Sequence, residues 1–253
     1  MRKTKHGPDC DCDLCHLGRA MDASIITGML NMSLLAAEPR HEGEVLDHVS
    51  RFAGECKLVF TDDLMRAFGP RDGRVNIHFF PPGPSRPFWT LVTAGLSDLP
   101  LCPPTNDQFD LAWAELAMCF PAEWRFGPDL VQDRWDGGPW YWPVKLMLDL
   151  AVIIHAEGNW IWYGHTSEFE DQPTLGDGVG FSSVIFRESD VLPEEFQELA
   201  LPGGKKIHFL SVVPLYPDEI RFARAKGHPR ELEERMEKAG VTDVVRIGRP
   251  SCL

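Results

Sequence analysis

The spacing of apolar residues changes along the chain from a helical period to a period of two. Val45, Val49 and Phe52 recur on one face of a helix predicted over residues 41–53, which Gly54 is expected to end. Runs rich in β-branched and aromatic residues then predict several strands joined by turns. These strands are predicted at residues 56–60, 75–80, 88–94 and 112–120.

Helices and strands are both predicted in the second half of the chain. A helix is expected to begin at Pro143, because proline suits the first helical position, and Leu146 and Leu150 belong to its apolar stripe. Gly158 is expected to end it. Further strands are predicted at residues 159–165, 180–187 and 206–213, and two short helices between Pro217 and Gly227 and between Pro229 and Gly240.

Strands with helices before, between and after them predict the α+β class. We expect a single domain with a mixed, largely antiparallel twisted sheet flanked by helices, spanning residues 41–250. Residues 1–40 are predicted to form an N-terminal leader. It combines a cysteine-rich segment with a helix over residues 21–37 that ends before Pro39.

Charge and cysteine content limit which class of partner and which cellular compartment are expected. The 253 residues carry a formal net charge of −13, which repels nucleic acid and favours a basic protein partner. The 7 cysteines include four scattered ones, a pattern that fits the reduced thiols of a cytoplasmic protein. The weakly apolar stretch 23–37 is too short and polar to span a bilayer. We therefore expect a cytoplasmic protein that contacts no membrane.

Cys10, Cys12, Cys15 and His16 are the densest group of potential metal ligands. Thiolates and an imidazole this close can hold zinc, but the adjacent Cys15 and His16 cannot easily face one ion together. The same residues spell the attachment motif of a c-type haem, which requires export, and no export signal precedes it. We predict no cofactor, with zinc at these four residues as the alternative to a thiol-rich leader.

His165, at the end of a predicted strand, is the strongest candidate for a catalytic residue. No cysteine, serine or carboxylate partner can be assigned to it from the sequence. Cys119 lies in an alternating apolar run and is interpreted as a buried, unreactive thiol. The sequence therefore favours a binding protein that is not an enzyme, with a hydrolase that uses His165 as the alternative.

An ordered set of motifs extends from about residue 41 to residue 248. It comprises Phe88–Leu99 with its Gly-Leu-Ser-Asp-Leu turn, the helix start Trp142-Pro143, Gly164-His165, the strand Ile207–Ile220 and the closing Gly240–Val245. Together these segments resemble suppressor-of-fused domains. In the turn, Gly95 is expected to permit a tight exit from a strand, and Asp98 to accept backbone hydrogen bonds.

The resemblance implies an α+β fold, no known catalytic activity and binding to a protein partner. Eukaryotic members bind and restrain Gli-type transcription factors, whereas bacterial members resemble immunity proteins that bind and neutralise a toxin. This chain lacks the long C-terminal extension of the eukaryotic proteins and so resembles the bacterial type. The expected partner is a basic toxin domain.

Six residues are predicted to contact the partner. The resemblance implies Ile153, Gly164 and His165, and His165 stands where the family is expected to carry an acidic residue. The predicted strand adds Trp160, Trp162 and Tyr163, because aromatic side chains fall on both of its faces and at least one face is then open to a partner. The competing interpretation places both tryptophans in the core.

Overall fold

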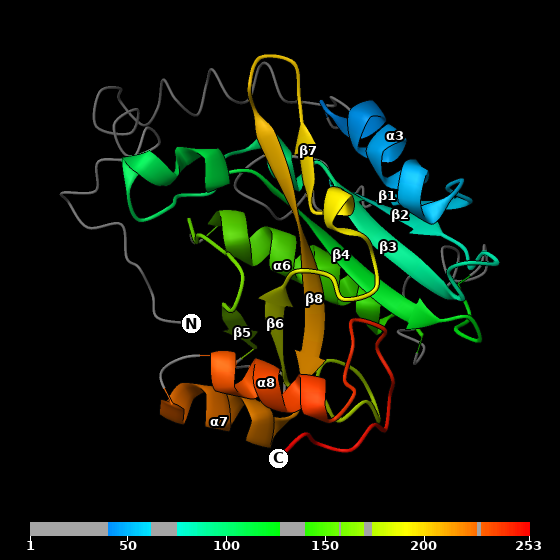
Figure 1. Cartoon of the computed structure of the whole chain (residues 1–253), viewed down its shortest axis with the longest axis vertical. Coiled ribbons are helices and arrows are strands. Elements are labelled where there is room, and N and C mark those ends of the chain that lie inside the picture. Colours follow the sequence, from blue (N-terminus) through cyan, green and yellow to red (C-terminus); the bar gives the residue numbers. More distant parts are fainter. Residues whose placement is uncertain (1–39, 62–74, 127–139, 157, 170–173, 227–228) are drawn as a thin grey trace.

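The computed structural model describes residues 40–61, 75–126, 140–156, 158–169, 174–226 and 229–253. Its strands form one mixed eight-stranded sheet in the order β1-β2-β3-β4-β8-β6-β5, and β7 also pairs with β8 (Figure 1). β4 and β8 are parallel, and all other paired strands are antiparallel. The strands are β1 (Leu58–Thr61), β2 (Asn76–Phe80), β3 (Phe88–Ala94), β4 (Ala114–Pro121), β5 (Thr166–Glu168), β6 (Ser183–Arg187), β7 (Glu198–Ala200) and β8 (Lys206–Leu215).

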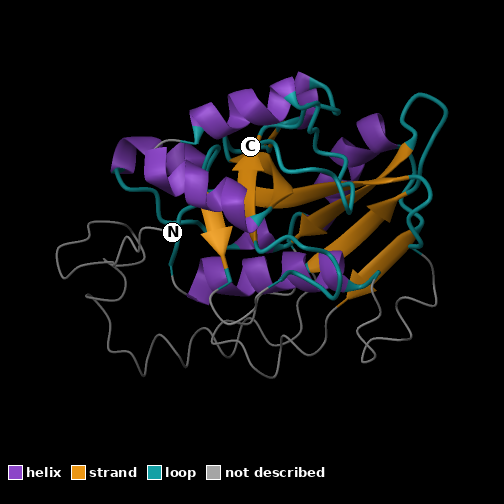
Figure 2. Ribbon diagram, turned by 90° about the horizontal axis from the view of Figure 1, so that it is seen from below, coloured by secondary structure: helices purple, strands orange, loops and turns teal. Residues whose placement is uncertain are grey.

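Helices cover both faces of this sheet, and Figure 2 shows the sheet as the middle layer between them. Side chains alternate between the two faces along β8: Leu210 and Val212 join the core beneath α6, whereas Ile207 and Phe209 join the core beneath α3. Near its end, β8 also packs against α7 and α8. The helices are α3 (Glu42–Ala53), α6 (Trp142–Ala156), α7 (Pro217–Lys226) and α8 (Arg230–Lys238). The prediction of a single α+β domain is confirmed.

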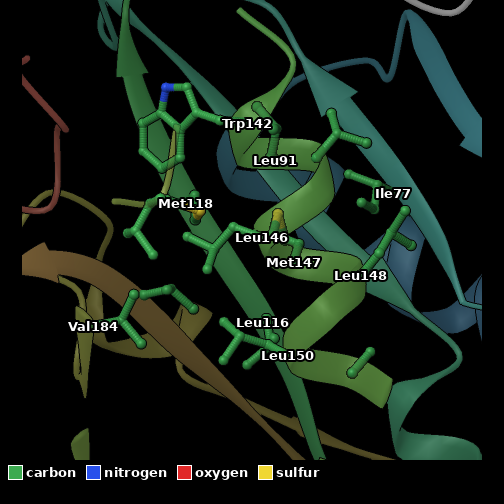
Figure 3. Close-up of a cluster of buried hydrophobic side chains, with 14 of the residues drawn as sticks. Ile77, Leu91, Leu116, Met118, Trp142, Leu146, Met147, Leu148, Leu150 and Val184 are labelled. Atoms are coloured by element: carbon green, nitrogen blue, oxygen red, sulfur yellow. The ribbon is translucent and has the colours of Figure 1, made fainter. Parts of the chain in front are cut away.

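Helix α6 forms the centre of the largest core cluster (Figure 3). Pro143 lies in its first turn, as predicted, and the helix buries side chains over most of its circumference. Leu146, Met147 and Leu150 lie among side chains of β2, β3, β4 and β6. A helix this deeply buried positions the chain that follows it, which carries the predicted site.

Residues 159–165 do not form the predicted strand. The segment is irregular, with a turn at Tyr163 and Gly164, and the strand β5 begins only at Thr166. Gly164 adopts a φ of +79°, and the His165 N–H donates to the Trp162 carbonyl at 3.0 Å. The left-handed glycine breaks the extended conformation that its aromatic neighbours favour, so the predicted two-sided strand is wrong.

The Gly-Leu-Ser-Asp-Leu turn is stabilised differently from the prediction for Asp98. Gly95 does leave β3 with a φ of +113°, as expected. The N–H groups of Gly95 and Ser97, however, donate to the Glu115 carboxylate, each at 3.0 Å. Asp98 accepts the backbone N–H of Arg40 at 2.8 Å, ahead of α3. The prediction was right about the glycine but chose the wrong carboxylate for the amides of the turn.

Several other predictions concern the leader and the membrane. The predicted helix over 21–37 and the group Cys10, Cys12, Cys15 and His16 lie outside the described residues. Among the residues that are described, no group of three or more His, Cys, Asp or Glu side chains could hold a metal ion. None of the described helices is long and apolar enough to cross a membrane.

Candidate partner-binding surface

The segment that follows α6 is held in place by backbone hydrogen bonds at both ends. The Asn159 N–H donates to the Ile154 carbonyl at 2.9 Å, which fastens the segment to the end of the helix. Farther along, the Gly164 N–H donates to the Phe186 carbonyl at 2.7 Å, and the Phe186 N–H donates to the His165 carbonyl at 2.9 Å. The segment is irregular, but the buried strand β6 anchors it.

Five aromatic and imidazole rings meet on this segment and the start of β8. The Trp160 and Trp162 rings are stacked, with centroids 6.1 Å apart, and His165 packs edge-on against Trp160 at 5.0 Å. Trp162 also contacts Tyr163 at 4.7 Å and His208 at 4.8 Å. We call Trp160, Trp162, Tyr163, His165 and His208 the aromatic patch.

The side chains of the patch lie partly in the core and partly in solvent. Trp160, Trp162 and Tyr163 pack against the core around α6, yet each remains only half-buried. The indole N–H of Trp160 donates to the Leu111 carbonyl at 3.2 Å, which fixes its orientation. The neighbouring Ile161 is fully buried and anchors the segment. The tryptophans therefore touch the core and still present a surface, and their contact with a partner stays a prediction.

Two carboxylates, those of Glu188 and Glu198, lie near the patch. Burial, together with the charges of Glu188 and Glu198, raises the pKa of Tyr163 to about 12. Glu198 also lies 4.0 Å from Nδ1 of His208. Burial lowers the pKa of both His165 and His208, so their rings are neutral at pH 7. Neutral aromatic rings next to carboxylates form a surface that suits a cationic ligand.

Comparison with known proteins places this fold in a family. A family model described as "Suppressor of fused protein (SUFU)" matches residues 71–250. The chain belongs to the suppressor-of-fused family. Its fold matches the SUFU homolog of Neisseria gonorrhoeae FA 1090 with a TM-score of 0.56 and 18% identity, over 84% of this chain and 97% of that chain. Among curated protein sequences, none matches this one.

Two further suppressor-of-fused structures share the fold. A chain of the Sufu-Fu complex matches with a TM-score of 0.56 and 17% identity, over 85% of this chain and 93% of that chain. Drosophila Suppressor of Fused matches with a TM-score of 0.57 and 16% identity, over 85% of this chain and 51% of its own. This chain thus spans about half of the Drosophila protein.

Within this suppressor-of-fused domain, the surroundings of His165 give no support to the hydrolase alternative. Its pKa responds to burial and to a hydrogen bond with the Trp160 backbone, and no carboxylate of the described residues contributes. A histidine that acts as a general base in hydrolysis needs a group that orients it and a nucleophile within reach. The His165 ring packs edge-on against Trp160.

The other two residues implied by the family resemblance, Ile153 and Gly164, differ in their surroundings. Ile153 is half-buried on α6 and packs against the same core as the tryptophans. Gly164 has a backbone role of its own, because a Cβ added there would lie 2.7 Å from Cγ of Pro229. His208 was not predicted for the site. It lies 43 residues beyond His165, and it meets Trp162 because β8 and the segment after α6 are both hydrogen-bonded to β6.

Gly164→Ala is expected to destabilise the domain by about 2 kcal/mol, because alanine is strained at a φ of +79° and also meets Pro229. Gly203 is a matched control: its φ is +96°, but a Cβ there meets nothing within 4 Å. Chemical denaturation of both variants would compare them. A loss for Gly203→Ala equal to that for Gly164→Ala would show that the contact with Pro229 contributes nothing.

Proposed function

We propose that this chain is a non-enzymatic protein-binding domain of the immunity type. In this proposal it binds and neutralises a basic toxin domain in the cytoplasm, and the aromatic patch is the contact surface. The observation that carries the proposal is the half-buried state of Trp160, Trp162, Tyr163 and His165 on one anchored segment.

The geometry of the patch supports a protein ligand. Aromatic side chains that are already oriented lose little conformational entropy on binding, and such residues dominate the binding energy of many interfaces. The stacked tryptophans and the hydrogen bond from Trp160 hold the rings in place before a partner arrives. A partner that covers them removes the remaining exposed apolar area from water.

Charge supports a basic partner. The chain carries a formal net charge of −13, and the exposed Glu188 and Glu198 lie beside Tyr163. Carboxylates at the rim of an interface accelerate association with a cationic partner and make it sensitive to salt. The solved Sufu-Fu complex supports a protein partner for a chain of this family.

Tyr163→Ala and His165→Ala should each weaken partner binding, and about 2 kcal/mol, or roughly 30-fold in Kd, is expected for Tyr163→Ala. A photoreactive amino acid at position 163 would first capture the partner in cells. Calorimetry with the purified partner would then measure affinity, with the exposed Ile247 changed to alanine as control. If both variants bind like the unmodified chain while their stability falls, the segment is scaffold and the interface lies elsewhere.

A further inference from the structure

A thiol, an imidazole and a carboxylate meet at the opposite edge of the sheet from β5. Cys56 precedes β1, His78 lies on β2, and Glu42 lies in the first turn of α3. Along β2, Asn76, His78 and Phe80 point to the face that α3 covers. The helix therefore brings Glu42 over the imidazole, and strand pairing brings the thiol beside it.

The order of contacts suits transfer of a proton away from sulfur. Sγ of Cys56 lies 3.8 Å from Nδ1 of His78, and Nε2 of the same ring lies 2.8 Å from Oε1 of Glu42. The Asn76 side chain donates to the same Glu42 oxygen at 2.6 Å and holds the carboxylate there. With its proton on Nε2, the imidazole faces the carboxylate and leaves Nδ1 free to accept the thiol proton.

His78 is the buried centre of the cluster, and Cys56 and Glu42 on either side of it are each partly exposed. His78 is only 1% exposed, and its Nε2 makes no well-aligned hydrogen bond, although Glu42 lies close by. Cys56 is half-buried, whereas Cys119 is fully buried. In the absence of a reagent, the Cys56 thiol donates to the Leu58 carbonyl at 3.3 Å. Burying His78 costs free energy, and the carboxylate of the partly exposed Glu42 offsets part of that cost.

We propose that Cys56, His78 and Glu42 form a thiol–imidazole–carboxylate relay that makes Cys56 a site of reversible modification by small disulfides. His78 takes the thiol proton on Nδ1, and the Cys56 thiolate attacks one sulfur of the disulfide. A new S–S bond joins Cys56 to half of the reagent while the original S–S bond breaks. The other half leaves as a thiolate and receives the proton from His78. Disulfide exchange fits this site because it needs an activated thiolate and a proton for the leaving thiol.

The relay predicts a distinctive pH dependence. Burial raises the pKa of the Cys56 thiol, and the charges of Glu42 and Glu55 raise it further, although Glu55 pairs with Lys57. An unassisted thiol of this kind would react about tenfold faster with each pH unit up to and beyond pH 8. Burial lowers the pKa of His78, and the nearby Glu42 opposes that effect. With a neutral imidazole as base, the rate should level off below pH 8.

The test is the reaction of the full chain with 4,4′-dithiodipyridine, resolved by peptide mass spectrometry. At pH 6.5, Cys56 should react faster than Cys102 and Cys252, and His78→Gln should slow it about tenfold or more. Glu42→Gln should slow it less. His48→Gln is the control, because that buried histidine contacts the Phe196 carbonyl and should leave the Cys56 rate unchanged. The buried Cys119 reports any loss of fold by becoming reactive.

Two rate comparisons would overturn the relay, and so would the pH profile of an unassisted thiol. One is a Cys56 rate no higher than that of Cys102, and the other is a His78→Gln variant that reacts like the unmodified chain while Cys119 stays protected. If Cys119 becomes reactive in His78→Gln, that variant has lost its fold. The proposal is then tested by the Cys56 rate in Glu42→Gln and by the pH profile of the unmodified chain. A rate that keeps rising tenfold per pH unit through pH 8 contradicts the proposal.

Discussion

Replacing Arg249 with alanine is expected to destabilise the domain by about 3–5 kcal/mol, the usual cost of breaking a buried ion pair from one side. Both terminal nitrogens of the Arg249 guanidinium, Nη1 and Nη2, donate to the Glu219 carboxylate, at 2.6 and 2.7 Å, and the Glu219 side chain is 0% exposed. One nitrogen also donates to the Pro214 carbonyl at 3.1 Å. The pair fastens the C-terminal segment to β8 and α7, so its loss releases several elements together.

Backbone hydrogen bonds to Glu219 increase the loss of stability expected for Arg249→Ala. The N–H groups of Tyr216 and Cys252 donate to the same carboxylate, at 2.8 and 3.0 Å. Burial acts to raise the pKa of Glu219, but these hydrogen bonds and Arg249 outweigh it, and the pKa lies below its ordinary value. The stabilisation is therefore present at neutral pH and is lost as pH falls through the lowered pKa. Without Arg249, a buried carboxylate loses its countercharge.

Urea denaturation at pH 7 would measure the effect. Arg246→Ala, which removes an exposed arginine three residues away, should change stability by less than about 0.5 kcal/mol. The double variant Arg249→Met, Glu219→Leu should lose less than Arg249→Ala, because no unpaired charge stays buried. A loss below about 1 kcal/mol for Arg249→Ala would show that the C-terminal segment does not hold the fold together.

Elements defined by a local pattern were predictable from the sequence. Helix α6 was found because Pro143 and an apolar stripe are properties of contiguous residues. The strand at 159–165 was wrong because its aromatic composition favours a strand, whereas Gly164 and the bonds to Phe186 decide the backbone. β7 was not predicted, because Glu198–Ala200 is short and gains its strand conformation only by pairing with β8.

The residues of the candidate sites also differ in whether a local sequence pattern or a long-range contact brings them together. Trp160, Trp162, Tyr163 and His165 could be grouped beforehand because they are neighbours in sequence. His208 joins them only through the packing of β8, and the relay of Glu42, Cys56 and His78 depends on how α3 lies over β2. No local period encodes either arrangement, since both depend on strand order and register. The same holds for Glu115, which reaches back to a turn 18 residues earlier.

Glu115→Ala should be the second strongly destabilising change, by about 4 kcal/mol or more, because several buried donors lose one acceptor. The carboxylate is 0% exposed and accepts the hydroxyls of Thr93 and Ser97, each at 2.7 Å, besides the N–H groups of Gly95 and Ser97. These groups hold the Gly-Leu-Ser-Asp-Leu turn against the start of β4. Glu123→Ala, at an exposed glutamate after the same strand, is the control and should have little effect.

The pH dependence of Glu115→Gln tests the same group without emptying its site. Burial raises the pKa of Glu115 from 4.5 to about 7, and its hydrogen bonds only partly oppose this. Between those pH values the unfolded chain releases a proton that the folded chain keeps, so the contribution of Glu115 to stability falls as pH rises. Glutamine does not titrate. The stability gap between the unmodified chain and Glu115→Gln should therefore be larger at pH 5 than at pH 8 in urea denaturation. A gap that widens toward pH 8 would mean that the four donors hold Glu115 ionised in the folded domain.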